Sequence, residues 1–242
     1  MKSLREIFNE HSGNLIHKLD HYFEIYERYF EKYRDKELVI LEIGISHGGS
    51  FQIWKKYFGS KVKIYAVDIN PDCKKLEEEN VTIFIGSQED KNFLSDIIKQ
   101  IPAPDLIIDD GGHTMKQQIV TFEALYQHLK DDGVYVCEDT CTSYWYEYGG
   151  GLHRRGSFIE YSKKLIDSLY AWHSESKKFK VNDITRSTNA IHFYDSMVIF
   201  EKLRRKAPEH VTKGEKTIAH NEDPMASQRT LLHKIIKKVK SV

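Results

Sequence analysis

Hydrophobic positions follow two different periods along the chain, and the change falls near residue 37. Through residues 1–36 aliphatic and aromatic residues recur every three to four positions, as in "LDHYFEIYERYF", which predicts helices. Ser12-Gly13 predicts a break between two such helices. We expect most of these aromatic side chains to pack against a sheet. From residue 37 to residue 203, short β-branched runs alternate with helical patterns.

The alternating region predicts a parallel sheet. Its apolar runs are "LVILEIGI", "KIYAVDI", "VTIFIG", "PDLIIDD" and "GVYVCEDT", and helical patterns between them lie near 49–58, 71–79, 91–100 and 115–130. Strands separated by crossover helices form a parallel sheet with helices on both faces. A further helix is expected at about 157–172.

The last two apolar runs, "AIHFYD" and "SMVIFEKL", are joined only by Asp195-Ser196. So short a link requires an antiparallel pair. The predicted fold class is therefore α/β, with a doubly wound, Rossmann-like, mostly parallel seven-stranded sheet that ends in a C-terminal antiparallel hairpin.

Three segments are predicted. Residues 1–36 form an N-terminal helical segment, residues 37–203 form the main domain, and residues 204–242 form a linker and a basic amphipathic helix. The helix pattern, "RTLLHKIIKKVKSV", has an apolar face and contains no acidic residue. It predicts a terminal helix that packs on its own domain or on a second subunit of a homo-oligomer, or one that lies on an anionic membrane surface.

Composition narrows the function classes. The 242 residues include 36 basic and 36 acidic side chains, so no overall charge favours nucleic acid as a partner. The three cysteines lack a disulfide-framework or zinc-pair spacing and follow no secretory signal, which predicts a reduced, cytoplasmic setting. Apolar runs fall short of the roughly 18 to 20 residues needed to span a bilayer.

A glycine-containing loop follows the first predicted strand of the sheet. The stretch "LEIGISHGGS" supplies a set of candidate cofactor residues: Glu42, Gly44, Gly48 and Ser50. Glycines at a strand-to-helix turn let the backbone approach a ligand closely. The spacing differs from the dinucleotide motif G-x-G-x-x-G, and the acid two positions before the first glycine fits S-adenosylmethionine (SAM) better.

The next two strand ends supply further parts of a nucleoside site. Asp68 ends the second strand, 24 residues after Gly44, where a carboxylate would hold a ribose diol. It is less suited to cap the following helix, because Pro71 already favours that helix start. Ser87 and Gln88 follow the third strand, where an adenine edge is expected.

Four carboxylates follow the fourth and fifth strands. Asp109 and Asp110 end one strand, Glu138 and Asp139 end the next, and neighbouring parallel strands bring such ends to one edge of a sheet. Like charges so close require a counter-charge, and carboxylate ligands select Mg²⁺, Mn²⁺ or Ca²⁺. We expect Asp109, Glu138 and Asp139 to bind this metal. Asp109 and Asp110 are also expected beside the cofactor.

Two alternatives remain open for this edge of the sheet. Some of the acids only cap helices and form salt bridges. His113, which follows in "IIDDGGH", is a partner of a metal ligand, a general base, or only a helix-start residue.

The motifs together resemble a known family. "LEIGISHGGS", "VDINPDC", "GSQED", "IIDDGGH" and "YVCEDTCTSYW" followed by "YGGG" are similar to the metal-dependent class I sugar O-methyltransferases of macrolide tailoring, a group that includes cephalosporin-modifying methyltransferase-like proteins. The likeness covers residues 16–203. It implies SAM as methyl donor, Mg²⁺ or Mn²⁺ at Asp109, Glu138 and Asp139, and a sugar hydroxyl as acceptor.

The chain departs from this resemblance at Cys141. The resemblance implies a histidine at this position, which is the proposed general base of the macrolide enzymes. Either Cys141, His113 or His153 is the base, or formation of a metal-bound alkoxide needs little help from a base. Asp139 is the candidate catalytic carboxylate at the metal. In the segment 143–157, aromatic and basic side chains form either a substrate lid or an ordinary exposed cluster: Tyr144, Trp145, Arg154 and Arg155.

The expected activity is SAM- and metal-dependent O-methylation of a sugar in a surface polysaccharide or a natural-product glycoside. Three alternatives are weighed against it. One is methylation of a non-sugar natural product, the second is a non-catalytic SAM-binding module, and the third is a nicotinamide-dependent oxidoreductase. The oxidoreductase is disfavoured because it would want a dinucleotide loop and would not need the acid cluster.

Overall fold

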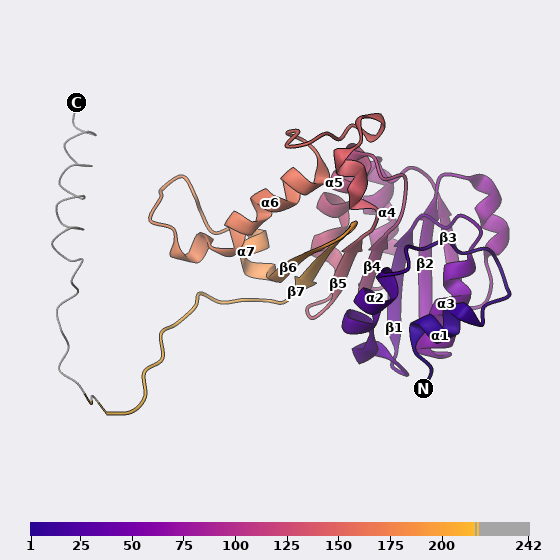
Figure 1. The fold of residues 1–242 in the computed structure, drawn as a ribbon, viewed down its shortest axis with the longest axis horizontal. Helices are drawn as coiled ribbons and strands as arrows, with labels where there is room; N and C mark the ends of the chain where they lie inside the picture. The colour runs from indigo at the N-terminus through magenta and orange to yellow at the C-terminus, as the bar shows by residue number, and fades with distance from the viewer. Residues whose placement is uncertain (216, 218–242) are drawn as a thin grey trace. The chain divides into compact units, whose positions relative to one another are not determined.

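The structure is a computed structural model that describes residues 1–215 and residue 217. Its sheet has seven strands in the order β3-β2-β1-β4-β5-β7-β6. The strands are β1 (Leu38–Ile43), β2 (Val62–Asp68), β3 (Val81–Ile85), β4 (Leu106–Asp109), β5 (Val134–Cys137), β6 (Thr188–Tyr194) and β7 (Met197–Lys202). The first five are parallel to one another, whereas β7 is antiparallel to both β5 and β6 (Figure 1). The predicted doubly wound sheet with its final hairpin is confirmed.

Helices cover both faces of the sheet. The α-helices are α1 (Leu4–Asn9), α2 (Tyr22–Phe30), α3 (Gly49–Phe58), α4 (Lys91–Gln100), α5 (Met115–Leu125), α6 (Phe158–Leu169) and α7 (Asp183–Ser187). One hydrophobic core joins α1, α2 and α3 to the sheet, and a second joins α4, α5 and α6 to the opposite face. Every residue of β1 is buried, as expected for a central strand covered on both sides.

Short 3-10 segments complete the fold: η1 (Glu31–Tyr33), η2 (Pro71–Leu76), η3 (Tyr126–His128), η4 (Thr140–Tyr144), η5 (Tyr146–Tyr148) and η6 (Ala171–His173). The helix expected near 71–79 is only the segment η2, which begins at Pro71. Side-chain caps mark the starts of two of the longer helices: Asp90 caps α4, and Thr114 forms a capping box with Gln117 at α5.

The N-terminal helices belong to the main body of the protein. Residues Met1–Ala207 form one compact unit, and Pro208–Val242 form a second. Within the second unit, the described residues 208–215 and 217 contain no helix or strand. The basic helix predicted at the C-terminal end lies outside the described residues, and the domain limits at 36 and 203 stay predictions. Helices in the described part of the chain are too short or too polar to cross a membrane.

The strand order decides where a ligand site can form. The chain passes from β1 to β2 on one side of the sheet and returns to place β4 on the other side of β1. At such a switch point the loops after the two strands turn in opposite directions and leave a crevice at their carboxyl ends.

Candidate active site

A cleft opens at this switch point, at the carboxyl ends of the parallel strands. Its volume is about 410 Å³, and it is bordered by the loops after β1, β2, β3 and β4 and by residues 15–18 of the N-terminal segment. Seven of the nine predicted cofactor residues line it: Glu42, Gly44, Ser50, Asp68, Ser87, Gln88 and Asp110. Gly48 and Asp109 do not, although Gly49 does.

The loop after β1 packs directly on the loop after β4. Gly44 has a φ of +89°, and a Cβ atom there would lie 2.0 Å from the carbonyl oxygen of Asp110. The loop is also tied to β2, because Asp68 Oδ2 accepts the backbone N–H of Ile45 at 2.8 Å. The positive φ of Gly44 and the lack of space for a Cβ atom both require glycine at position 44.

Three polar side chains converge at the rim of the cleft. Ligand atoms of Asp110, His113 and Asp139 lie within 4.8 Å of one another. His113 Nε2 is 3.6 Å from Asp139 Oδ2 and 3.8 Å from Asp110 Oδ1. His113 and Asp139 both have left-handed backbone conformations, with φ of 57° and 50°, which are uncommon without glycine and occur often at functional sites.

A buried lysine lies beside this group. The Lys18 side chain is 3% exposed, and its ammonium donates to Asp110 Oδ2 and, at 2.8 Å, to Glu138 Oε2. Burial alone would lower the pKa of Lys18, but attraction from Asp110 and Glu138 outweighs burial and raises the pKa above its ordinary value. The ammonium is thus a permanent positive charge among the acids.

Glu138, a predicted metal ligand, is held on both oxygens in this structure. Tyr26 donates its hydroxyl proton to Oε1, and Lys18 donates to Oε2. Burial and repulsion from Asp110 raise the pKa of Glu138, and the adjacent ammonium opposes that rise. Each oxygen of Glu138 thus accepts a hydrogen bond, and its role as metal ligand stays a prediction.

The acid that faces His113 and Asp139 from the end of β4 is Asp110 and not Asp109. Asp109 is 1% exposed, and its oxygens accept hydrogen bonds from Gln88 and Tyr135 at 3.1 and 3.0 Å. Burial raises the pKa of Asp109 to about 7. Asp110, the residue after β4, lines the cleft, whereas Asp109 does not. The roles of Asp109 as metal ligand and cofactor residue stay predictions.

The N-terminal segment supplies site residues that the sequence analysis missed. Lys18, Tyr22 and Tyr26 each donate a hydrogen bond to an acid of the cluster. In the sequence, these three residues are four positions apart and each carries a polar atom, which could have indicated that they donate to one site. The aromatic pattern instead predicted only core packing for the two tyrosines.

The donor set fits a hard divalent cation. Asp110 Oδ1, Asp139 Oδ2 and His113 Nε2 face one another, and Asp110, Glu138 and Asp139 outnumber the single ammonium of Lys18. Carboxylate oxygens suit Mg²⁺ or Mn²⁺ better than a thiolate-selecting ion. Asp110 and Asp139 would hold the metal, with His113 beside it.

Comparison with known proteins connects this site to a family. A family described as a methyltransferase domain matches residues 41–140, from β1 to just beyond Asp139. The demethylmacrocin O-methyltransferase of Streptomyces fradiae is 33% identical over 190 residues, which are 73% of this chain and 47% of that protein. The mycinamicin VI 2''-O-methyltransferase of Micromonospora griseorubida is 31% identical over 74% of this chain and 47% of that protein. Residues 41–140 belong to this methyltransferase domain family.

Solved structures of a family member share the fold. The MycE methyltransferase of the mycinamycin biosynthetic pathway, in complex with Mg and SAH, has a TM-score of 0.79 and 28% identity over 95% of this chain and 60% of that one. Its complex with Mg, SAH and mycinamycin VI has a TM-score of 0.76 and 29% identity over 84% of this chain and 54% of that one. The chain spans about half the length of the curated relatives it matches.

The other two candidate bases, Cys141 and His153, do not line the cleft. Cys141 is half-buried in η4 and does not line the cleft. His153 is exposed, with Nδ1 3.7 Å from Glu160 Oε1. Of the three candidate bases, His113 is the one that the structure brings to the cleft.

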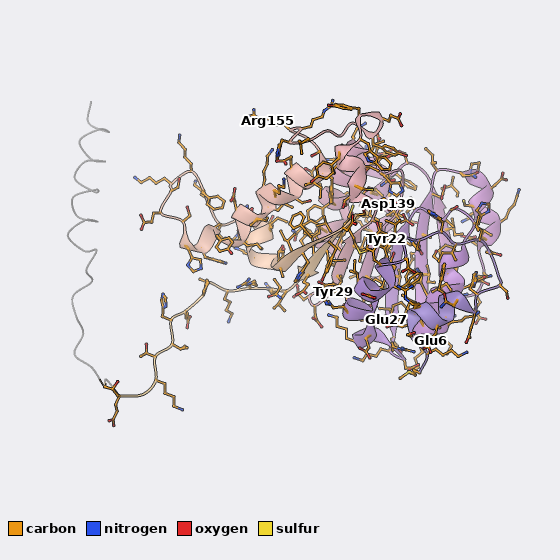
Figure 2. The ribbon with its side chains drawn as sticks, in the orientation of Figure 1. Glu6, Tyr22, Glu27, Tyr29, Asp139 and Arg155 are labelled. Atoms are coloured by element: carbon orange, nitrogen blue, oxygen red, sulfur yellow. The ribbon has the colours of Figure 1, made fainter. Side chains whose placement is uncertain are left out.

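The predicted substrate residues lie in the loop after β5. Tyr144 and Trp145 are 49% and 51% exposed, so both rings are available to a ligand. Arg154 donates to the carbonyl oxygen of Gly150 at 3.1 Å. Arg155 lies at the outer part of this loop, away from Asp139 (Figure 2). The structure does not bring these four residues into the cleft, and their substrate role stays a prediction.

Glu42 should make the stability of the metal-free methyltransferase pH-dependent. Burial raises the pKa of Glu42 from 4.5 to about 7, against the opposing influence of Lys18 and Ser50. Between these values the folded state keeps a proton that the unfolded state has lost, so the contribution of Glu42 to stability falls as pH rises. We expect Glu42→Gln to gain about 2 to 3 kcal/mol relative to wild type between pH 5 and 8.

Urea unfolding at several pH values measures this difference. Glu6→Gln is the control. Hydrogen bonds from Ser3 lower the pKa of Glu6, so its contribution to stability grows as pH rises, and the stability lost on its replacement should grow as pH rises. A Glu42→Gln curve parallel to that of wild type would contradict the expectation.

Proposed function

We propose that the protein is a SAM-dependent, divalent-metal-dependent O-methyltransferase that acts on a sugar hydroxyl. The observation that carries the proposal is the junction of the nucleoside-type cleft with the Asp110, His113 and Asp139 group at one edge of the sheet. The relatives support it, because they are named as O-methyltransferases and one is seen with Mg and SAH.

The cleft offers the contacts that SAM needs. Gly44 and Gly49 line the cleft, and Asp68 stands where the ribose diol would lie. Both polar atoms of the Gln88 amide already have protein partners. Its nitrogen donates a hydrogen bond to Asp109, and its oxygen accepts the backbone N–H of Gly112 at 2.7 Å. We therefore assign the adenine edge to Ser87.

Methyl transfer needs an acceptor oxygen held in line with the sulfonium and relieved of its proton. A bound Mg²⁺ or Mn²⁺ would supply Lewis acidity and orient a sugar diol. His113 lies at the lip of the cleft and is placed to accept the hydroxyl proton as general base. Asp139, near His113 Nε2, would favour the protonated imidazole that results.

The acceptor class is proposed from the side chains of the loop after β5. Exposed rings at Tyr144, Trp145 and Tyr146 offer faces for a sugar, and Arg154 and Arg155 add positive charge for an acidic or phosphorylated glycan. We propose a natural-product glycoside or a surface polysaccharide as the acceptor class and the cytoplasm as the site of reaction.

The test is transfer of radiolabelled methyl from SAM to a panel of glycosides with vicinal hydroxyls. EDTA should reduce transfer by at least about a hundredfold, because an unassisted hydroxyl is a poor nucleophile, and Mg²⁺ or Mn²⁺ should restore it. Undiminished transfer in EDTA would contradict metal dependence. SAM binding without transfer to any acceptor would favour a binding module, and calorimetric binding of NADH instead of SAM would favour an oxidoreductase.

A further inference from the structure

Helix α2 contacts two acids at the carboxyl edge of the sheet. Tyr22 and Tyr26 lie one turn apart and are each 1% exposed. The hydroxyl oxygen of Tyr22 is 2.8 Å from Asp139 Oδ1 and accepts the backbone N–H of Asp139 at 3.1 Å. Tyr26 donates to Glu138 Oε1. Figure 2 shows Tyr22 beside Asp139, with Tyr29 farther along the helix.

These contacts divide the oxygens of the acids into two sets. Asp139 Oδ1 is bound by Tyr22, and Asp139 Oδ2 faces His113 at 3.6 Å. Asp110 Oδ2 is bound by Lys18, and Asp110 Oδ1 faces His113 at 3.8 Å. Each carboxylate is thus held through one oxygen on the N-terminal side, and its other oxygen is directed to the shared point.

The second carboxylate is held through a chain of contacts. Tyr26 binds Glu138, Glu138 binds the ammonium of Lys18, and Lys18 binds Asp110. Both carboxylates that face His113 therefore depend on a tyrosine hydroxyl of α2, one directly and the other through two intermediates.

We propose that Tyr22 and Tyr26 are positioning residues, which fix Asp139 and Asp110 in the orientation that binds the divalent cation. This inference rests on the proposed function, because it takes Asp110 and Asp139 as ligands of the cation beside His113. Partners that orient metal ligands commonly change metal affinity by 10- to 100-fold when they are removed.

Packing alone does not account for the hydroxyls. Phenylalanine would fill nearly the same volume in the aromatic cluster of α2, as Phe23 and Phe30 do. A buried hydroxyl must find a partner. Tyr26 donates to Glu138, and the hydroxyl of Tyr22 lies 2.8 Å from both Asp139 Oδ1 and the carbonyl oxygen of Ser196. Tyr29 instead meets the hydroxyl of Tyr194 at 2.8 Å, away from the acids. Tyr29 is therefore a matched control with the same residue type on the same helix.

The experiment measures Mn²⁺ binding to the cofactor-free, full-length protein by electron paramagnetic resonance. Wild type, Tyr22→Phe, Tyr26→Phe and Tyr29→Phe are compared, and the melting temperature of each confirms that it is folded. We expect Tyr22→Phe and Tyr26→Phe to weaken Mn²⁺ binding by about tenfold or more, with Tyr29→Phe equal to wild type. Methyl transfer by the two weakened variants should recover toward the wild-type rate in excess Mn²⁺, which a purely structural loss would not do.

Each outcome decides the inference. Wild-type affinity in every folded variant of Tyr22 and Tyr26 overturns it and leaves the proposed function intact. Equal weakening in Tyr29→Phe also overturns it, because a general effect of α2 would then be responsible. Absence of Mn²⁺ binding by wild type overturns both the inference and the metal dependence. If one variant does not fold, the other gives the decision.

Discussion

Asp139→Asn is expected to reduce methyl transfer by at least about a thousandfold, equivalent to roughly 4 kcal/mol of transition-state stabilisation. Asparagine keeps the size of the side chain and still accepts a hydrogen bond from Tyr22 through its oxygen. It removes the charge of the oxygen that faces His113 at 3.6 Å. Cation binding and support of a protonated His113 should therefore both be lost. SAM affinity should change only a few-fold, because the loops after β1, β2 and β3 form most of the cleft.

Single-turnover transfer of labelled methyl and calorimetric titration with SAM measure the two quantities separately. Asp131→Asn is the matched control, because Asp131 is exposed and precedes β5, at the opposite edge of the sheet from Asp139. It removes the same charge and should leave both quantities unchanged. An Asp139→Asn protein that retains a tenth of wild-type activity would show that the acid group does not carry the reaction.

Gly44→Ala is expected to weaken SAM binding by at least about a hundredfold and to lower the melting temperature. The added methyl group would lie 2.0 Å from the carbonyl oxygen and 2.7 Å from the carbonyl carbon of Asp110, and both are backbone atoms. Relief requires the loops after β1 and β4 to separate, which would change the cleft and displace Asp110 together. The positive φ of +89° adds strain of about 1 kcal/mol for any side chain.

Gly48→Ala separates crowding from backbone strain. Gly48 also has a positive φ, +75°, but its added methyl would meet side chains and not backbone, the nearest being Leu76 at 3.0 Å. We expect a modest loss of stability and SAM affinity within about tenfold of wild type. Calorimetry with SAM on both variants provides the comparison. Equal losses in the two proteins would show that crowding against Asp110 is unimportant.

The sheet could be predicted almost completely from the sequence. The reason is that each strand is a short apolar run bounded by polar residues, and the link Asp195-Ser196 is too short for anything but a hairpin. The helix near 71–79 was wrong in type because Pro71 and the following polar residues have little apolar periodicity, and the chain forms η2 there. The predicted meeting of acids from β4 and β5 at one edge follows directly from parallel pairing.

The orientation of each acid was less predictable. In "LIIDD" the apolar residues Leu106, Ile107 and Ile108 are all buried, so no alternation reveals which face Asp109 or Asp110 takes. Choosing between them needs the positions of the neighbours, above all Tyr135 and Gln88, which bind Asp109. The donors of the N-terminal segment were hidden for a related reason. Aromatic residues at helical spacing indicate a buried face, and the pattern does not show where a hydroxyl on that face ends.

The family match begins at residue 41, yet Lys18, Tyr22 and Tyr26 come earlier in the chain. A shortened protein cut to the matched region would retain Asp110, His113 and Asp139 and would lose every donor that steadies them from the N-terminal side. Engineers who wish to transplant this chemistry onto another scaffold should therefore count the first thirty or so residues as part of the catalytic apparatus. Searches for relatives with the same hydrogen-bond contacts should likewise look upstream of the glycine loop for a lysine and two tyrosines spaced by four.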